Sequence, residues 1–369
     1  MKTIIECSFY AYMIALIVTL SLSFVILNND ITQKNQELRS IETYLEIESK
    51  TINVNAATIK TGTVSGDYYV YHYVGYPKKK IDTVASTTIF STLTADSAQK
   101  LINAAKNMGI ETHVFAWKAG DVGEKSADFF YPISIVEKDE ILKKCREIGV
   151  DGICSIASDL AAITVNYVAH EMRLVGNSPR CAMISTNKHL MRQAFEENGD
   201  PSPKSILVAS IDDLNEIKLK YPIIVKPIDR SGSRGITKLL TEDGLEEAIE
   251  NAKKQGFEKK ALIEEFVTGQ EYSVECVTFH GEHRFLAMTK KYTTGAPHFI
   301  ETGHLEPAPV SSELLERVKK VVFHALDSLC ITDSASHTEL KITDKGEIYL
   351  IEIGGRMGGD CIGSDLVQL

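Results

Sequence analysis

Between residues 81 and 183, short apolar runs alternate with segments whose apolar residues recur at helical spacing. The strand candidates are 110–117 and 150–158. The helix candidates are 94–109, 138–149 and 160–172. Parallel strands need a crossover to return the chain to the same edge of the sheet, and a helix usually supplies it. The alternation therefore predicts an α/β region with a parallel sheet covered on both faces.

The second half of the chain has a different pattern. From about residue 206 the strand candidates are mostly hairpin-like, and helices are expected only at 245–255 and 312–329. This arrangement is typical of an α+β region. A further helix is expected at 185–199, with Ser185 or Thr186 as its N-cap. The predicted fold class is thus α/β and α+β in successive domains.

Charge and cysteine content narrow the classes of function. The formal net charge of −10 argues against a general nucleic-acid binder, which is more often basic. The seven cysteines form no CxxC pair and their number is odd. They indicate free thiols in a reducing compartment rather than a disulfide framework or a zinc site. We therefore expect the globular region to be cytoplasmic and to bind no nucleic acid.

The amino terminus contains an uncharged run of 21 residues at 7–27. This length is sufficient for a membrane-spanning helix, although a buried core helix is the alternative. We interpret residues 1–30 as a hydrophobic helix that anchors the chain in a membrane, with undecided orientation. Residues 31–80 are expected to form a stalk or linker, 81–183 the α/β domain and 184–369 the α+β domain.

A lysine inside an apolar strand is the first candidate for chemistry. Lys226 follows the run "PIIV", where an unpaired charge would be costly, so an anion is expected beside it. The loop 229–235 offers successive backbone N–H groups that can enclose a polyphosphate. It lacks the GxxxxGK[ST] pattern and lies between two strands. A lysine extending from a strand end and an ordinary surface hairpin are the alternatives.

Two glutamates are expected to face each other in a late hairpin, "SHTELKITDKGEIYLIEIGGRMGGD". A two-residue turn at Lys345 and Gly346 would pair Glu339 with Glu352 on one face of the sheet. Opposed carboxylates repel unless a cation lies between them, and Mg²⁺ prefers oxygen ligands that it shares with phosphates. A solvated acidic pair is the alternative. Arg356, in the glycine-rich turn that follows, is suited to hold a phosphate oxygen.

Taken in order, these elements resemble the ATP-grasp superfamily from about residue 100 to 369, most closely the carboxylate–amine ligases of the L-amino acid ligase type. The family order is a lysine in an early helix, a "VKP" strand, a Gly/Ser loop, an "EEF" hinge and two metal-binding acids. The resemblance implies an ATP-grasp fold with a preceding parallel-sheet domain. It also implies that Lys188 and Lys226 contact the ATP phosphates, with Lys226 and Arg356 in catalysis.

The resemblance assigns further roles. The residues of the phosphate-covering loop would be Ser231, Gly232, Ser233 and Gly235. The adenine and ribose would be bound by Glu264, Phe266, Val267 and Glu271. Glu339 and Glu352 would bind Mg²⁺ or Mn²⁺. The stretch "APHFIETGHLEPAP" resembles one near the amino acid substrate in L-amino acid ligases, which assigns Glu301 and His304 to substrate; His304 as a loop histidine is the alternative. Gly359 and Asp360 would lie at the same pocket.

The implied activity is an ATP-dependent ligation of a small carboxylate to an amine, with amino acids as substrates, through an acyl phosphate.

Two departures from the family pattern matter. Gly354 stands where the family often has a metal-binding Asn, and the chain ends where the family normally continues, so we expect a C-terminally truncated domain. The alternatives are a membrane-tethered nucleotide-binding protein without turnover, and another ATP-grasp ligase of the purine-pathway or carbamoyl-phosphate type. The sequence does not predict the oligomeric state.

Overall fold

The computed structural model describes residues 58–64, 68–73, 89–91, 95–118, 122–214, 218–296, 299–359 and 362–367. The described chain divides into two compact units. Strands β11 (Gln270–Phe279) and β12 (Glu282–Thr293) contribute residues to both of them. The mixed α/β class predicted from the sequence is confirmed.

The first unit takes its described residues from Met1–Lys80, Gln270–Ser273 and Ala287–Val310. Its strands are β1 (Thr58–Val64), β2 (Tyr68–Tyr73), β13 (Glu301–Glu306) and the last part of β12. They pair antiparallel in the order β1-β2-β13-β12. The register of β12 and β13 places Lys291 directly opposite His304. Their side chains therefore share one face of the sheet.

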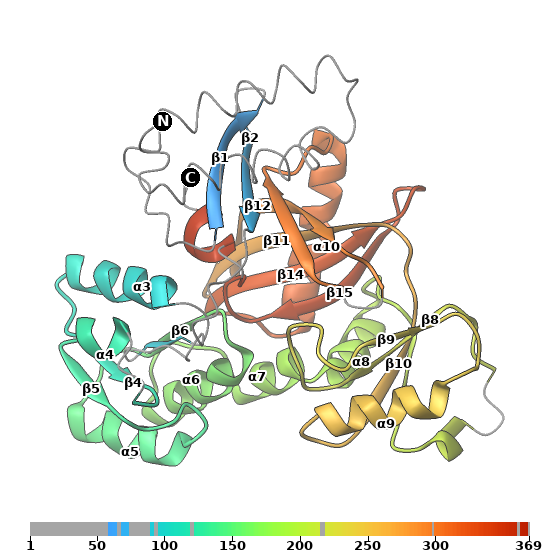
Figure 1. Ribbon diagram of the computed structural model, residues 1–369. Helices are drawn as coiled ribbons and strands as arrows, with labels where there is room; N and C mark the ends of the chain where they lie inside the picture. Colours follow the sequence, from blue (N-terminus) through green and yellow to red (C-terminus); the bar gives the residue numbers. More distant parts are fainter. Residues whose placement is uncertain are drawn as a thin grey trace, which may run out of the picture. The chain divides into compact units, whose positions relative to one another are not determined.

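The second unit takes its residues from Ile81–Gly269, Val274–Leu286 and Ser311–Leu369. Its first layer is a sheet of β3 (Ile89–Ser91), β4 (His113–Phe115), β5 (Phe129–Tyr131) and β6 (Cys154–Ile156), in the order β5-β4-β3-β6. All three neighbouring pairs are parallel. The associated helices are α3 (Ala95–Asn107), α4 (Val122–Ser126), α5 (Lys138–Ile148) and α6 (Asp159–Met172) (Figure 1). Apolar side chains of α5 and α6 form a core with Phe115 of β4.

A second sheet in this unit carries the lysine strand. Its members are β7 (Ser205–Val208), β8 (Ile223–Pro227), β9 (Thr237–Leu239) and β10 (Ala261–Glu265), all antiparallel in the order β7-β10-β8-β9. A short 3₁₀ turn (Ile211–Leu214) follows β7, and α9 (Leu245–Gln255) covers one face. Val225 and Ile263 pack in the core beneath α9. Because side chains alternate along a strand, the next residues, Lys226 and Glu264, lie on the opposite face.

The remaining elements of the unit are α7 (Pro179–Thr186), α8 (Lys188–Asn198), α10 (Ser312–Ser328), β14 (Ser334–Ile342), β15 (Ile348–Gly354) and a π turn (Ile362–Leu366). The helix expected at 185–199 is wrong at its start. Asn187 separates α7 from α8, and its side chain accepts hydrogen bonds from the backbone of His189 and Leu190. Ser185 and Thr186 instead end α7, so neither is the N-cap of the lysine helix.

The late hairpin pairs Glu339 with Glu352, as predicted, but not through the turn that was assumed. Near the turn, Ile342 lies opposite Ile348. This pairing is shifted by one residue from the pairing that the assumed turn predicts. An irregularity after Glu339 then shifts the pairing by one residue. A bulge of this kind puts two residues of one strand opposite one of the other. The two glutamates therefore face each other because of the bulge.

Among the described residues, no helix combines the length and the apolar character needed to cross a membrane. The uncharged run at 7–27 lies outside the described residues.

Candidate active site

Lys226 and Glu264 form a buried ion pair on the face of the second sheet that α9 does not cover. The distance from Lys226 Nζ to Glu264 Oε2 is 2.6 Å, and both side chains are about 5% exposed or less. Burial lowers the pKa of Lys226, and the nearby Arg192 lowers it further. The sequence assigned Lys226 to phosphate and Glu264 to adenine, and the structure brings these two side chains together.

Arg192, which the sequence analysis missed, is the third member of this network. Its Nε lies 2.8 Å from Glu264 Oε1, and its Nη2 donates to the carbonyl of Ile351 at 2.6 Å. Burial by itself raises the pKa of Glu264, but the charges of Arg192 and Lys226 outweigh it and hold the pKa below its ordinary value. Arg192 lies four residues after Lys188, a spacing that puts both on one face of α8.

The buried Lys188 forms a second ion pair, with the half-buried Glu352. Its Nζ lies 2.6 Å from Glu352 Oε1 and also donates to the carbonyl of Arg230 at 2.8 Å. Asn187 caps the helix immediately before it and fixes where the lysine projects. The two lysines assigned to phosphate are therefore each neutralised by a glutamate that belongs to the same predicted site.

The two predicted metal-binding glutamates have basic neighbours. Glu339 Oε1 lies 3.6 Å from His337 Nε2, and the other ring nitrogen of His337 bonds to Glu275. Burial lowers the pKa of His337, but the carboxylates of Glu275 and Glu339 outweigh it and raise the pKa to about 9. Glu275 also accepts from the backbone N–H of Gly358 at 3.0 Å. His337, to which the sequence analysis assigned no role in the site, thus lies beside the predicted metal site.

Two carboxylates opposite each other suit a magnesium ion, since Mg²⁺ binds one or two carboxylates and takes its other ligands from water and phosphates. Within the part of the chain that the structure describes, no cluster of three or more His, Cys, Asp or Glu side chains is assembled as a metal site. The donor set of Glu339 and Glu352 therefore fits an ion that is shared with a polyphosphate.

The loop between β8 and β9 contains three residues with a left-handed backbone. Gly232, Ser233 and Gly235 all have positive φ, at 69°, 53° and 72°. Such residues allow the tight turns in which neighbouring N–H groups can bind oxyanions. The adjoining Ser231 carbonyl accepts from Arg234 Nε at 3.1 Å. The loop lies between two strands, as the sequence predicted.

The predicted adenine hinge follows β10. Lys238 Nζ lies 3.6 Å from the ring centroid of Phe266, and Lys341 Nζ donates to the carbonyl of Val267 at 3.5 Å. The hinge passes very close to β14, because a Cβ at Gly269 would lie only 2.5 Å from the carbonyl oxygen of Ile342. Glycine is therefore required there by the close approach of two backbones.

Arg356 is held by Asp159, the first residue of α6. Its Nε donates to Asp159 Oδ1 at 2.7 Å and its Nη2 to Oδ2 at 3.3 Å. Burial by itself lowers the pKa of Arg356, but the Asp159 carboxylate outweighs it and raises the pKa. Asp159 lies 197 residues away in sequence, and no local signal marked it as a member of the site. Nearby, the predicted substrate residue Gly359 accepts at its carbonyl from the backbone of Ile362 at 2.9 Å.

The first unit holds the predicted ribose and substrate residues around a buried lysine that the sequence analysis missed. Lys291 Nζ lies 2.6 Å from Glu301 Oε1 and 3.8 Å from Glu271 Oε1. His304 Nε2 lies 3.2 Å from the other oxygen of Glu301. The side chains of Lys291 and His304 are each about 1% exposed. Glu271, Glu301 and His304 therefore belong to one cluster around a buried lysine, in which the two carboxylates are half-buried. Asp360 lies outside the described residues.

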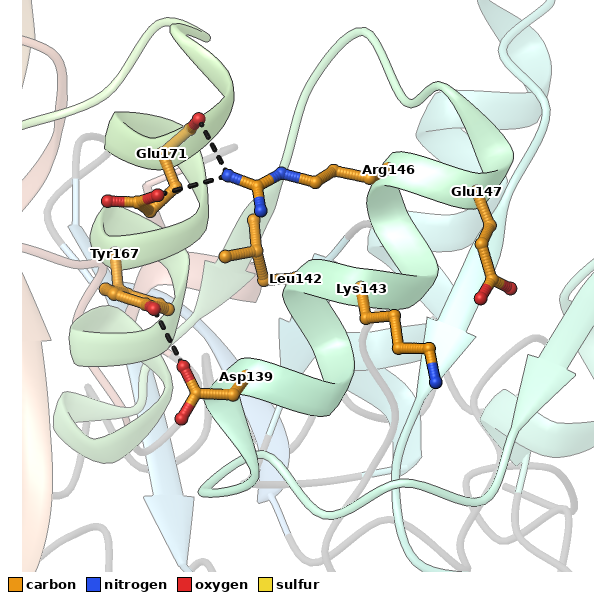
Figure 2. A pocket seen from close by; sticks show the side chains of 7 residues that line it. All are labelled: Asp139, Leu142, Lys143, Arg146, Glu147, Tyr167 and Glu171. Atoms are coloured by element: carbon orange, nitrogen blue, oxygen red, sulfur yellow. Dashed lines mark hydrogen bonds and ion pairs between the residues drawn. The ribbon is translucent and has the colours of Figure 1, made fainter.

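One pocket lies apart from Lys226, and another reaches the ion-pair network of Arg192 and Glu264. The pocket in Figure 2, about 600 Å³, lies on α5 and α6, and its polar groups pair with each other: Arg146 with Glu171 at 3.1 Å and Tyr167 with Asp139 at 2.7 Å. A second pocket of about 650 Å³ lies at the end of β7, β8 and β10 and reaches Arg192 and Glu264. The second pocket adjoins the predicted hinge, because Glu264 and Glu265 line it.

Comparison with known proteins agrees with this geometry. Residues 219–365 match the family model of the ATP-grasp domain. The chain is 27% identical to alanine–anticapsin ligase of Bacillus subtilis (strain 168) over 277 residues, which cover 66% of this chain and 58% of that protein. It is 29% identical to D-alanine–D-alanine ligase of Thermoanaerobacter sp. (strain X514) over 203 residues, 50% of this chain and 54% of that one.

The fold also resembles that of a solved L-amino acid ligase from Bacillus licheniformis. The TM-score is 0.65 at 24% identity, covering 74% of this chain and 68% of the other. The match to the family model therefore assigns an ATP-grasp domain to residues 219–365, as the sequence motifs indicated. The chain spans less than two thirds of the length of the two ligase relatives named above.

Proposed function

We propose that this chain is an ATP-dependent carboxylate–amine ligase that acts on amino acids through an acyl phosphate. The observation that carries the proposal is the arrangement of Lys188, Lys226, Glu339 and Glu352. Two buried lysines lie beside carboxylates, and one of these carboxylates, that of Glu352, faces Glu339 across a hairpin. A triphosphate with Mg²⁺ supplies the charges that this arrangement can bind. The ligase relatives and the ATP-grasp family match support the same activity.

In the proposed reaction, an oxygen of the substrate carboxylate attacks the γ-phosphorus, the bond to the β-phosphate oxygen breaks, and ADP leaves. The amine nitrogen then attacks the acyl carbon, the carbon–oxygen bond breaks, and inorganic phosphate and a proton are released. Such phosphoryl transfer depends mainly on positioning and charge neutralisation. When bound at Glu339 and Glu352, Mg²⁺ (or Mn²⁺) would neutralise developing negative charge on the phosphates.

The side chains of the protein would bind the nucleotide, stabilise the transferred phosphoryl group and orient the amino acid. Lys188 and Lys226 would exchange their glutamate partners for phosphate oxygens, and the loop 231–235 would cover those oxygens with backbone N–H groups. Glu264, Phe266 and Val267 would hold the adenine, and Glu271 the ribose. Arg356 would stabilise the phosphoryl group in transfer. Glu301 and His304 would orient the amino acid, and the sequence resemblance assigns Gly359 to the substrate as well.

The location of the protein belongs to the same proposal. We expect the ligase region to lie in the cytoplasm and the uncharged run at 7–27 to anchor it in a membrane. Fractionation of cells that express the full chain, beside a variant lacking the first 30 residues, tests the anchor. Recovery of both proteins in the soluble fraction would contradict it.

The activity is tested by incubating the full chain with ATP, Mg²⁺, pools of amino acids and hydroxylamine. An acyl phosphate reacts with hydroxylamine to give a hydroxamate, so the proposal predicts hydroxamate and ADP that depend on an amino acid. Glu352→Ala should abolish both products. Binding of ATP without ADP or hydroxamate formation would contradict turnover and favour a nucleotide-binding protein. Hydroxamate formed only from carboxylates other than amino acids would overturn the proposed substrate class.

A further inference from the structure

We propose that Asp159 is the positioning residue for Arg356, and that position 354 is a glycine because this ion pair occupies the space of a side chain. The inference rests on the proposed function, in which Arg356 stabilises the phosphoryl group in transfer. It adds a residue from the parallel-sheet region to a site that the sequence placed wholly in the second half of the chain. It also gives a physical reason for Gly354, which departs from the family pattern.

The geometry of the pair is that of a two-point clamp. Arg356 donates through Nε at 2.7 Å and Nη2 at 3.3 Å to the two oxygens of one carboxylate. Paired N–H donors that meet both carboxylate oxygens fix the plane of the guanidinium as well as its position. A third bond, from Nη1 to the carbonyl of Met357 at 3.0 Å, completes the hold. The side chain of Arg356 is 13% exposed, so water competes little for these bonds.

The clamp leaves part of the guanidinium for a ligand. Arginine has five N–H donors, and the three bonds described above use one on Nε, one on Nη1 and one on Nη2. One N–H remains on each terminal nitrogen, with no partner among the described residues. Two such donors suit the oxygens of a phosphoryl group. Asp159 therefore orients Arg356 without occupying the donors that the reaction needs.

Asp159 itself has a rigid support. It is the first residue of α6, and Ser158 caps that helix by accepting from the backbone N–H of Ala161 at 3.2 Å. A carboxylate in the first turn is also favoured by the helix dipole. Ala161 and Val168 of the same helix are buried in the core around Phe115. The orientation of Arg356 is thus set by the packing of α6.

The space around Gly354 supports the proposal independently of the hydrogen bonds between Asp159 and Arg356. A Cβ at this position would lie 3.0 Å from Arg356 Nε and 3.3 Å from Asp159 Oδ1. Its φ lies outside the left-handed region, so the backbone conformation does not require glycine. The neighbouring Gly355 differs, since a Cβ there would make only ordinary contacts, the nearest being Ser185 Oγ at 3.7 Å. Space for the ion pair is what position 354 requires.

Three variants test the proposal in the full chain. Asp159→Asn removes the negative charge of the side chain while nearly keeping its shape. Gly354→Ala adds a Cβ that crowds the ion pair between Asp159 and Arg356. Gly355→Ala is the matched control. We expect kcat for amino-acid-dependent ATP cleavage to fall about tenfold to a hundredfold in the first two, as for a misplaced catalytic group. The KM for ATP should change by less than about threefold, because the loss is confined to the transition state. Gly355→Ala should behave as the unmodified chain.

A second measurement does not depend on turnover. The Nε–H resonance of Arg356 is followed by NMR after ¹⁵N-labelling of arginine and is assigned from Arg356→Lys. A clamped Nε–H should be protected from exchange in the unmodified chain and in Gly355→Ala, and should lose protection in Asp159→Asn and Gly354→Ala. Unchanged kcat and unchanged protection in a folded Asp159→Asn protein would overturn the proposal, as would a rise in kcat. Protected Arg356 in a chain without turnover would instead refute the proposed function alone.

Discussion

Replacing Glu264 with Gln should destabilise the chain more than any change to an exposed carboxylate. The carboxylate of Glu264 forms ion pairs with Lys226 at 2.6 Å and with Arg192 at 2.8 Å, and all three side chains are at most 5% exposed. Removing one partner of a buried ion pair leaves an uncompensated buried charge, at a cost of about 3–5 kcal/mol. Glutamine keeps the shape but leaves two cations facing each other. We therefore expect a loss near the upper end of that range.

The measurement is thermal unfolding, checked by urea titration. An unfolding entropy of about 2.1 cal/mol/K per residue gives about 0.8 kcal/mol/K for this chain of 369 residues, so 1 kcal/mol corresponds to about 1.3 °C and Glu264→Gln should melt about 5–7 °C lower. Glu265→Gln is the matched control, because Glu265 is the next residue of β10 and is exposed. Its change should stay within about 1 kcal/mol. If the two variants lose equal stability, the buried network has been assigned wrongly.

Three further outcomes are expected. Lys291→Met should cost about 1–3 kcal/mol of unfolding free energy, because it removes the buried partner of two half-buried carboxylates, whereas Lys290→Met on the other face of β12 should cost about 1 kcal/mol or less; equal losses in chemical denaturation would contradict the pairing of Lys291. Gly269→Ala should lower the melting temperature, because its Cβ would lie 2.5 Å from a backbone carbonyl, and an unchanged melting temperature would refute that contact. The hydrogen bond to Asp200 raises the pKa of His324, so its contribution is present below pH 6.5 and is lost as pH rises through the folded pKa. Solvent exposure keeps that contribution below about 1 kcal/mol, and an NMR titration of His324 that gives a pKa at or below 6.5 would contradict it.

The sequence predicted which segments carry the site residues better than it predicted how those residues contact each other. The apolar run before Lys226 and the acids of the late hairpin were visible because strand alternation acts over a few residues. The facing of Glu339 and Glu352 was predicted from a turn that the chain does not use. A bulge beyond the turn produces the same pairing, and sequence patterns do not locate such a bulge reliably.

The residues that sequence reasoning missed are those that act across long distances in the chain. Asp159 meets Arg356 from a helix that was predicted correctly, but nothing in that helix indicated a partner 197 residues later. Arg192 could have been found, because it lies one helical turn after Lys188. Lys291 could not be distinguished from Lys290 in "TKKY" until the pairing of β12 and β13 fixed which one faces the buried side.

Binding of ATP to the full chain by calorimetry, with and without Mg²⁺, tests the central claim most directly. Glu352→Gln is compared with Glu347→Gln, an exposed acid of the same hairpin. We predict Mg²⁺-dependent binding to the unmodified chain and to Glu347→Gln, and at least about tenfold weaker binding to Glu352→Gln, a difference of 1.4 kcal/mol. Absence of binding to the unmodified chain, or equal affinity in both variants, would contradict a nucleotide site built on the lysines and glutamates described above.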